Sequence, residues 1–499
     1  MAPPNTLASA VDHVESPPIS SSGRKKVLVV SDSLGRPIHR RGIFYYTSNL
    51  VRALRTCGYD VCLMVEHSGS HIKADRRLSA VFASAAPRAR LLDIYNYLWV
   101  DSHIWDSHQS RAKHRLRRFV ANDLLRRPET APLISTEGLR LTLGLPALLP
   151  TEIVANDVSQ IDFVPEGLDH LLSISAFVLC PSVYSLSEAG AAAGLNAPVV
   201  DARGFDIILV DTPTNLQFRT SNGAQNVSVI HDLLPLSDPT ISKYWRKVFS
   251  HKLAQTIKNT NAYIFVSHFS CQRFKDFFPE AIEGRRISIL APSVDDAITR
   301  ECDGNTGRSE ITNTPIYFVA IVSDEVRKNI ATMVAAFSLL PHDVGLKIIG
   351  NVNAGRYGHV PEQVIHLPGG LRAARASQIE WLGHVSEIAK RTILAGATGV
   401  VVPSFAEGFG IPVIEGCFFG KPVFCSDISV FREVVGDNAF YFDPSSPRSI
   451  ANAIEDYLNN RRHYLQRIEQ ANADARRRFS LSAVTGEVGR YFGDLGQEM

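Results

Sequence analysis

Short hydrophobic runs alternate with helix-like segments along most of this 499-residue chain. Val27–Val30 is an aliphatic run that ends at polar residues, Tyr45–Arg55 has apolar positions at helical spacing, and Val61–Val65 supplies the next run. Strands that are hydrophobic at every position are typical of parallel sheets, whose two faces are both covered by helices. The chain is therefore expected to open with a strand–helix–strand unit of an α/β fold.

Strand-like runs return later in the first half, at Phe205–Val210, Asn226–Ile230 and Ala262–Val266. The last run leads into Ser267, a residue type that favours the N-cap of a helix. Between the first two groups of strands, Arg111–Arg127 mixes cations with apolar residues in a pattern that looks helical. We favour a solvated helix face for this segment, and contact with an anionic membrane surface is the alternative.

A polar, turn-rich segment at 303–315 reads as a linker, and beyond it the alternation starts again. The order of expected elements predicts a second doubly wound parallel sheet. These elements are strands at Ile316–Val322, Leu346–Ile349, Glu380–Leu382, Gly399–Val402 and Val423–Cys425, and helices at Ile330–Leu339, Ser386–Ala395 and Pro412–Phe419. Pro447–Phe479 is expected to be a final helical stretch.

We therefore expect a flexible tail at 1–24, a first Rossmann-like domain at 25–302, the linker at 303–315 and a second Rossmann-like domain at 316–475. The segment 476–499 is expected to be a C-terminal helix or tail, with packing back onto the first domain as one option. Two doubly wound sheets place a ligand crevice between the carboxyl ends of their strands. The cleft between the two domains is therefore the expected place for chemistry.

Composition narrows the class of protein. A formal net charge of +2 gives no field that would indicate a nucleic-acid partner. The seven cysteines are scattered, which fits a reducing compartment and argues against a disulfide framework or a structural zinc site. Apolar runs such as Ser173–Cys180 fall short of the roughly 18–20 residues that a membrane span needs. A cytoplasmic location is the resulting expectation.

The strongest chemical signal is the segment Glu407–Glu415, between an expected strand and an expected helix that opens at Pro412. Its glycines allow close backbone approach to a ligand, and a helix N-terminus offers N–H groups to an anion such as a diphosphate. The two carboxylates suit the hydroxyls on either side of that diphosphate, so the segment fits a nucleotide sugar. The alternative is structural: Glu407 caps a helix and Glu415 is a favourable charge near the helix start.

The pattern Glu-x7-Glu with an internal Gly-Phe-Gly-x-Pro resembles the signature of the retaining glycosyltransferases of family 4, which have the GT-B fold. The resemblance continues through Trp381–Val385, Val402–Ser404, Gly420–Val423 and Asp443-Pro444. It implies that Glu407 holds the donor hexose and Glu415 the ribose hydroxyls. The other donor-binding residues that it implies in this loop are Gly408, Phe409, Gly410 and Ile411.

Arg327 and Lys328 follow the first strand of the second domain and are the second candidate. Two adjacent cations at the edge of a sheet can neutralise a leaving diphosphate, in place of a metal ion. The chain has no Asp-x-Asp pair of the kind that holds a divalent cation in other glycosyltransferases, so no metal is expected. Many relatives carry a Gly-Arg pair where Ala320–Val322 stands, and Arg327 is expected to take over that role. The alternative is a solvated helix start.

His231 and Gly42 complete the expected site from the first domain. His231 ends a strand and resembles the histidine that contacts the donor sugar near the reaction centre in this family, although a structural role is the alternative. Gly42 resembles part of the family's glycine-rich loop that faces the diphosphate and the acceptor, with a plain turn as the alternative. A second glycine of that loop is replaced by Phe44.

The resulting hypothesis is a retaining glycosyltransferase that needs no metal or other cofactor. It would move a hexose, with mannose from GDP-mannose favoured and a UDP-sugar as the alternative, to a glycan or lipid-linked acceptor in surface polysaccharide biosynthesis. Such a protein acts in the cytoplasm, and peripheral contact with the inner face of the plasma membrane is a further option. The rival hypotheses are a sugar-nucleotide epimerase or phosphorylase of the same fold and a non-catalytic subunit that binds sugar nucleotides.

Overall fold

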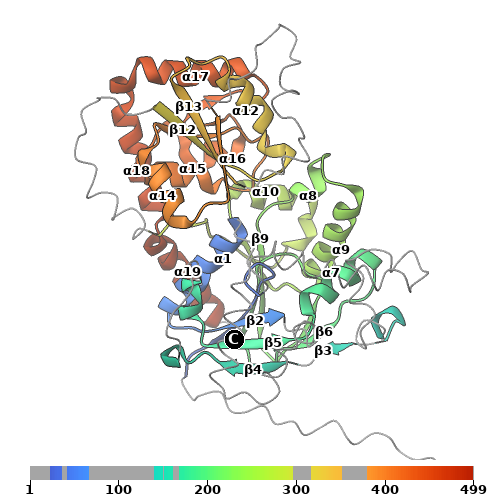
Figure 1. Cartoon of the computed structure of the whole chain (residues 1–499). Helices are drawn as coiled ribbons and strands as arrows, with labels where there is room; N and C mark the ends of the chain where they lie inside the picture. Colours follow the sequence, from blue (N-terminus) through green and yellow to red (C-terminus); the bar gives the residue numbers. More distant parts are fainter. Residues whose placement is uncertain are drawn as a thin grey trace, which may run out of the picture.

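The computed structural model describes residues 23–35, 42–66, 140–145, 147–149, 151–160, 168–295, 316–350 and 379–497. These residues form two α/β domains, which lie one above the other in Figure 1. The expected linker at 303–315, the segment Arg111–Arg127 and all but the last two residues of the expected tail lie outside the described residues. Among the described residues, no helix has both the length and the apolar character needed to cross a membrane.

The lower domain is built on an eight-stranded sheet with the order β11-β10-β9-β7-β1-β2-β5-β4. All neighbouring strands are parallel except β4, which runs antiparallel to β5 at one edge. The strands are β1 (Lys26–Val30), β2 (Asp60–Glu66), β4 (Glu152–Ala155), β5 (Ala176–Cys180), β7 (Ile207–Val210), β9 (Gln225–Ile230), β10 (Ala262–Phe265) and β11 (Arg286–Ile289). A small parallel sheet of β3 (Leu148–Leu149), β6 (Val199–Asp201) and β8 (Gln217–Arg219) completes the domain.

The sequence of strand β1 is continuously hydrophobic because both of its faces are buried. Val27 and Val29 belong to one buried cluster, whereas Leu28 and Val30 belong to another. Alternate side chains of a strand point to opposite faces of the sheet, so both faces of β1 are covered. The hydrophobic run therefore follows from the position of β1 in the middle of a two-sided sheet.

The upper domain contains a six-stranded, all-parallel sheet with the order β14-β13-β12-β15-β16-β17. Its strands are β12 (Ile316–Ile321), β13 (Val344–Ile349), β14 (Ile379–Gly383), β15 (Gly399–Val402), β16 (Val423–Ser426) and β17 (Phe440–Phe442). The strand order reverses beside β12, which starts the domain, as in other doubly wound sheets. The expected second parallel sheet is thus present.

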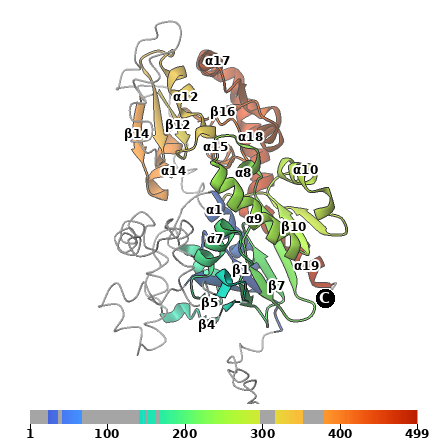
Figure 2. The ribbon, with the colours of Figure 1, turned by 90° about the vertical axis from the view of Figure 1, so that its right-hand side faces the viewer.

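Helices cover both sheets (Figure 2). In the lower domain they are α1 (Gly42–Thr56), α7 (Val183–Ala193), α8 (Leu234–Ser237), α9 (Lys243–Asn259) and α10 (His268–Phe277). In the upper domain they are α12 (Ile330–Phe337), α14 (Glu387–Gly396), α15 (Ile411–Phe418), α16 (Ser429–Val435), α17 (Pro447–Asn459) and α18 (Leu465–Phe479), followed by α19 (Leu481–Gln497).

Two expected helices need correction. Helix α15 begins at Ile411, one residue before Pro412, because Gly410 adopts a left-handed conformation and forms the N-cap. The stretch Pro447–Phe479 is not one helix. It breaks at Asn460, whose backbone N–H bonds to the carbonyl oxygens of Asp456 and Tyr457 and closes the last turn of α17.

The last helix, α19, returns to the lower domain and packs against α1 (Figure 1). The return occurs at Ser480, where the backbone of Val294 accepts from Leu481 N and donates to Phe479 O. Val488 and Phe492 of α19 are fully buried in the same cluster as Val51 of α1. The C-terminal helix is therefore part of the core of the N-terminal domain.

Candidate active site

The candidate site starts from two loops at the carboxyl edge of the upper sheet. Strands β12 and β15 are parallel neighbours, so the loops that follow them leave the sheet at the same edge. The loop after β12 contains a short 3-10 helix, η6 (Val326–Lys328), and the loop after β15 contains residues 403–410. Phe405 N donates to Arg327 O at 2.8 Å, and Asn329 Nδ2 donates to Pro403 O at 2.9 Å. These bonds join the two loops into one unit.

Glu407 is the centre of this unit. Its Oε2 accepts from Arg327 Nη1 at 2.7 Å, and its Oε1 accepts from Lys328 Nζ at 2.5 Å and from Ser404 Oγ at 2.7 Å. Only 7% of Glu407 is exposed. Charge-assisted bonds of this kind are the strong ones, so the carboxylate is held in one orientation. The structure thus brings Glu407 together with two adjacent cations that lie 80 and 79 positions earlier in the sequence.

The electrostatics of the cluster favour its charged forms. Burial alone would raise the pKa of Glu407, but the adjacent cations of Lys328 and Arg327 and the bonds from Lys328 and Ser404 lower it to about 2. Burial would lower the pKa of Arg327, but Glu407 and Glu325 raise it above its usual range. Glu407 and Arg327 are therefore both ionised at neutral pH.

The two cations keep donor capacity for a ligand. Arg327 uses Nε for Glu325 at 2.6 Å and Nη1 for Glu407 and the Ala406 carbonyl. Within the described residues, its Nη2 makes no hydrogen bond, and Lys328 makes only the bond to Glu407. A guanidinium has five N–H donors and an ammonium has three, so both side chains can bind a phosphate while they hold Glu407.

Gly408 is required by the packing of the two domains, and Gly410 by its own backbone conformation and by packing within the upper domain. A Cβ on Gly408 would lie 2.7 Å from the backbone oxygen of His231, in the lower domain. Gly410 has a φ of +104°, and a Cβ there would lie 2.5 Å from the Phe431 ring. No side chain caps α15, whose N-terminus follows directly. This leaves a backbone turn and a helix N-terminus suited to an anion.

The oxygen of Gly408 is bound by the lower domain. Ser267, the N-cap of α10, donates its hydroxyl to Gly408 O at 2.9 Å, and Ser270 does so at 3.2 Å. In return, Glu433 of α16 accepts from His268 N at 2.7 Å and from Phe269 N at 2.8 Å. Each domain therefore satisfies polar groups at the other's loop and helix start, which sets the position of the loop 403–410.

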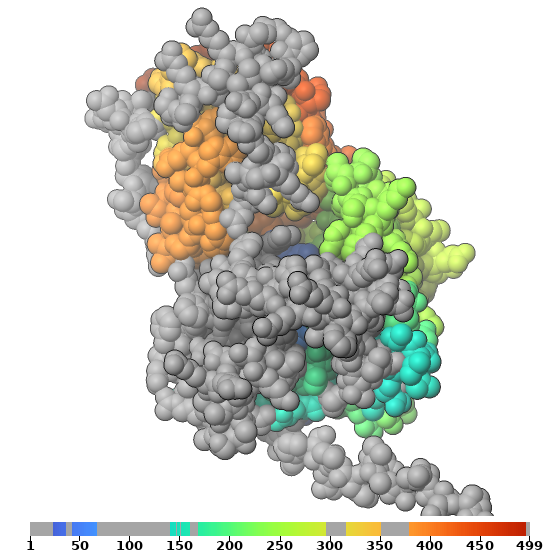
Figure 3. Space-filling view, turned by 45° about the vertical axis from the view of Figure 1, so that its right-hand side comes forward, coloured from blue at the N-terminus to red at the C-terminus, as the bar shows by residue number. Residues whose placement is uncertain are grey.

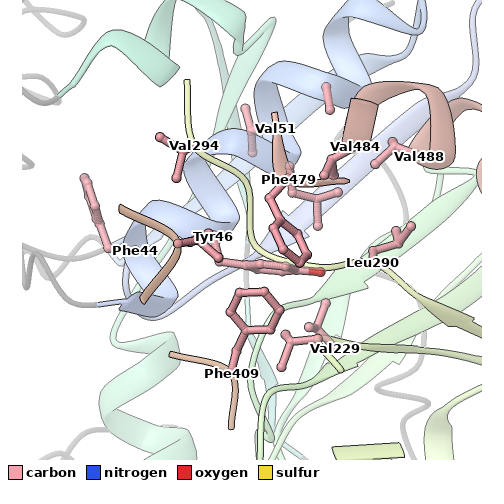
Figure 4. Packing of buried hydrophobic residues seen from close by; sticks show 14 of the residues in the cluster. Phe44, Tyr46, Val51, Val229, Leu290, Val294, Phe409, Phe479, Val484 and Val488 are labelled. Atoms are coloured by element: carbon pink, nitrogen blue, oxygen red, sulfur yellow. The ribbon is translucent and has the colours of Figure 1, made fainter. Parts of the chain in front are cut away.

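Phe409 and Ile411 lie at the junction of the domains. Phe409 is 6% exposed, and its ring is edge-to-face with Phe479 at a centroid distance of 5.4 Å. Figure 4 shows Phe409 among Tyr46 and Val229 of the lower domain. Ile411 approaches the start of α1, since a Cβ on Gly42 would lie 3.3 Å from Ile411 Cδ1. Phe409 is thus part of the core between the domains, whereas Gly42 is exposed beside Ile411.

His231 follows β9 on the lower side of the same junction. Its ring is edge-to-face with Tyr46 at 4.9 Å and hydrogen-bonds to the backbone of Asp211. Burial lowers the pKa of His231 to about 4, although the bond to Asp211 opposes this shift. The imidazole is therefore neutral at pH 7. Within the described residues its buried Nε2 has no hydrogen-bond partner, so the acceptor capacity of this atom is unused there.

Glu415 lies in the second turn of α15, and its surroundings were not foreseen from the sequence. Lys390 of α14 donates to Glu415 Oε1 at 2.8 Å and pairs with Glu387 at 3.0 Å. Tyr45 of α1 donates its hydroxyl to Glu387, and its ring lies 5.1 Å from Lys390 Nζ. The Glu387–Lys390 spacing on a helix was a visible signal, but Glu415 and Tyr45 come from distant segments.

The structure thus gathers all of the sequence candidates at the junction of the domains, in two groups. Glu407, Arg327 and Lys328 form one ion-pair cluster, and Glu415 belongs to a second one with Lys390. In Figure 3, the green part of the lower domain lies against the yellow part of the upper domain, and dark blue atoms from near the start of the chain are visible at the junction. His231 and Gly42 reach this junction from the lower domain.

Comparison with known proteins shows what the upper domain is similar to. Residues 305–474 match the model of the family described as "Glycosyl transferases group 1". O-antigen chain mannosyltransferase B of Escherichia coli is 34% identical over 137 residues, which are 27% of this chain and 35% of that protein. The serotype-specific mannosyltransferase WbdA of Escherichia coli is 26% identical over 287 residues, 53% of this chain and 34% of that protein. The chain therefore spans about a third of the length of either relative.

Among solved structures, the sucrose-phosphate synthase of Thermosynechococcus elongatus superposes with a TM-score of 0.58 at 12% identity. The superposition covers 95% of this chain and all of that one, so the likeness extends over both domains and concerns the fold. The chain forms two doubly wound domains, which meet at the carboxyl edges of their sheets. The second domain matches a glycosyltransferase family model, and together these features identify the architecture. The chain has the GT-B fold, and its residues 305–474 are similar to the glycosyltransferases of group 1.

Proposed function

We propose that the chain is a retaining glycosyltransferase that needs no metal and transfers a hexose from a nucleotide diphosphate sugar. The observation that carries the proposal is the Glu407 cluster. A buried, ionised carboxylate is held by two cations that keep free N–H donors, next to the open N-terminus of α15. This arrangement offers a hydroxyl acceptor and a diphosphate site side by side.

In the proposed reaction, Arg327, Lys328 and the N-terminus of α15 stabilise the charge that develops on the leaving diphosphate. The bond between the anomeric carbon and the diphosphate oxygen breaks, and its electron pair stays with the diphosphate. The acceptor hydroxyl attacks from the same face, forms the new glycosidic bond and gives its proton to a diphosphate oxygen. The anomeric configuration is thereby retained without a covalent intermediate on the protein.

Each remaining residue has a defined part in this scheme. Glu407 accepts hydrogen bonds from the hexose, Glu415 accepts them from the ribose, and His231 Nε2 accepts one from the sugar near the reaction centre. The uncharged state of His231 suits this role, because a protonated ring has no acceptor atom. Gly42 and Gly408–Ile411 line the diphosphate side through backbone groups rather than side chains.

The two relatives described above are named mannosyltransferases, which favours mannose from GDP-mannose, with a UDP-sugar as the alternative. Their names also favour a glycan or lipid-linked acceptor in surface polysaccharide biosynthesis. A thermal-shift screen with GDP-mannose and UDP-glucose tests the donor, because a ligand that binds only the folded state raises the melting temperature.

Transfer activity is tested with Glu407→Ala and Glu415→Ala. Loss of transfer is expected for Glu407→Ala, and weakened donor binding is expected for Glu415→Ala. Glu469→Ala, at an exposed position of α18, is the matched control and is expected to behave as wild type. Wild-type activity in both site variants would exclude this assignment. Isomerisation of the donor without acceptor would indicate an epimerase, and binding without turnover a non-catalytic subunit.

A further inference from the structure

Lys390 forms a second ion-pair cluster beside the proposed ribose site. Its ammonium lies 2.8 Å from Glu415 Oε1 and 3.0 Å from Glu387 Oε2. The side chains of Lys390, Glu415 and Glu387 are 13%, 14% and 20% exposed, so the cluster is largely withdrawn from water. A surface ion pair contributes little, but a pair this well buried is costly to break by removing one partner.

Lys390 binds one oxygen of Glu415, Oε1. Within the described part of the chain, no hydrogen bond or ion pair reaches Glu415 Oε2. A carboxylate that is fixed through one oxygen presents the other in a defined direction. The carboxylate of Glu415 is therefore already oriented to accept a hydrogen bond from a ligand hydroxyl when the ligand binds.

The same cluster extends into the other domain. Tyr45 of α1 donates to Glu387 Oε1, and its ring lies against the ammonium of Lys390. Three residues earlier on α1, Gly42 lies against Ile411 at the start of α15. Helix α1 thus contacts two helices of the upper domain: α15 through Ile411, and α14 through Glu387 and Lys390.

We propose that Lys390 is a positioning residue for donor binding, which orients the Glu415 carboxylate toward the ribose hydroxyls of the nucleotide and links it to Tyr45 of the N-terminal domain. The inference rests on the proposed function, because it assumes that Glu415 binds a nucleotide. Lys390 itself needs no contact with the ligand. It acts through Glu415 and is not a catalytic residue.

The electrostatics agree with this role. Burial would lower the pKa of Lys390, but Glu415, Glu387 and Tyr45 raise it above its ordinary value. The pKa of Glu387 is lowered: burial opposes the shift, but Lys390 and the bond from Tyr45 outweigh it. Both groups are therefore charged at neutral pH.

The test compares Lys390→Met with Lys390→Arg and with the control Lys347→Met in the full-length chain. Lys347 also pairs with a glutamate, Glu380, and lies over a tyrosine ring, but it is on strand β13. Binding of GDP and of UDP is measured by calorimetry, and KM and kcat are measured with the donor sugar. Lys390→Met is expected to weaken nucleotide binding and raise the donor KM about tenfold, with kcat within about twofold of wild type. Lys390→Arg retains most of the affinity, and Lys347→Met leaves binding unchanged.

A double-mutant cycle shows whether Lys390 acts through Glu415. In a Glu415→Gln background, Lys390→Met is expected to add less than about a twofold further loss of affinity. An equal loss in both backgrounds, or a fall in kcat and melting temperature at unchanged KM, would overturn the inference in favour of a structural role. Nucleotide binding by Lys390→Met equal to that of wild type would overturn it as well. A wild-type chain that binds neither GDP nor UDP would instead overturn the proposed function.

Discussion

At the residue scale, the site depends on a carboxylate, that of Glu407, which stays ionised although it is buried. Glu407 is surrounded by protein, yet two cations and a serine hydroxyl hold it in the charged form. Removing one partner of such a group leaves the others buried and unpaired, which costs more than the loss of the contact itself. The same ion pairs of Glu407 thus contribute to the stability of the upper domain and hold the residues of the candidate site in place.

This link predicts a defined pH dependence. The pKa of Glu407 is lowered from 4.5 to about 2 in the folded protein, so its contribution is complete above pH 4.5 and is lost as the pH falls toward 2. The shift corresponds to roughly 3 kcal/mol of stability. We expect Glu407→Gln to be less stable than wild type at pH 7 and the difference to shrink at pH 3, as measured by urea unfolding. Glu469→Gln is the control, and a difference that is constant with pH would contradict the prediction.

At the scale of elements, the turn between β15 and α15 connects the two domains. Gly408 lies against the backbone that follows β9. Its carbonyl oxygen accepts hydrogen bonds from the hydroxyls of Ser267 and Ser270 at the start of α10. Glu433 of the upper domain accepts hydrogen bonds from the first two backbone N–H groups of α10. Gly408 is therefore explained by close approach of protein backbone as well as by any ligand, whereas Gly410 is explained by its φ of +104° and by the Phe431 ring.

Gly408→Ala tests this close approach. The added methyl group would meet a backbone oxygen at 2.7 Å, which cannot move aside as a side chain end does. We expect a loss of roughly 1–3 kcal/mol in stability, together with weaker donor binding. Gly486→Ala is the matched control, because no atom lies within 4 Å of the new Cβ on α19. Equal stability of the two variants in denaturant titrations would show that the loop relaxes freely.

At the scale of the whole molecule, one hydrophobic cluster spans both domains. It includes Val29 of the lower sheet, Phe409 of the loop 403–410 and Phe492 of α19. The chain crosses back at Ser480, so α19 completes the N-terminal domain with residues from the opposite end of the sequence. The relative position of the two domains is thus set by shared packing.

Phe492→Ala tests the contribution of α19. Phe492 is fully buried, and its ring contacts Tyr59 in the N-terminal domain. Truncating a buried phenylalanine costs about 3–5 kcal/mol, so we expect lower stability and faster amide hydrogen exchange in α1. Leu465→Ala, at a position of α18 that is 55% exposed, is the control. Unchanged exchange in α1 would show that α19 does not stabilise it.

Much of this architecture was predictable from local patterns. The hydrophobic runs at Val27–Val30 and Gly399–Val402 became buried parallel strands, and the polar residues after them lie at the carboxyl edge of a sheet. The very short strands β3, β6 and β8 were missed, because two or three residues carry no period. The break at Asn460 was missed because the apolar positions continue on both sides of it.

The roles of Arg327, Lys328, Glu407 and Glu415 stay predictions until they are tested, but their arrangement shows where sequence reasoning ends. A loop placed after a strand follows from local rules, because parallel strands end at one edge. The partner of a given side chain does not follow from local rules, since it depends on how separate helices and sheets pack. Lys390 met Glu415 and Tyr45 only through such packing.

The sequence by itself determined the two alternating α/β regions and the strand–loop–helix segment with its glycines and carboxylates, because these depend on residues close together in the chain. Tertiary structure alone decided that Phe409 lies in the core between the domains, that α19 returns to α1, and that Lys390 holds Glu415. The physical reason is the same in each case: burial and ion pairing depend on distances between segments, and only the packed molecule sets those distances.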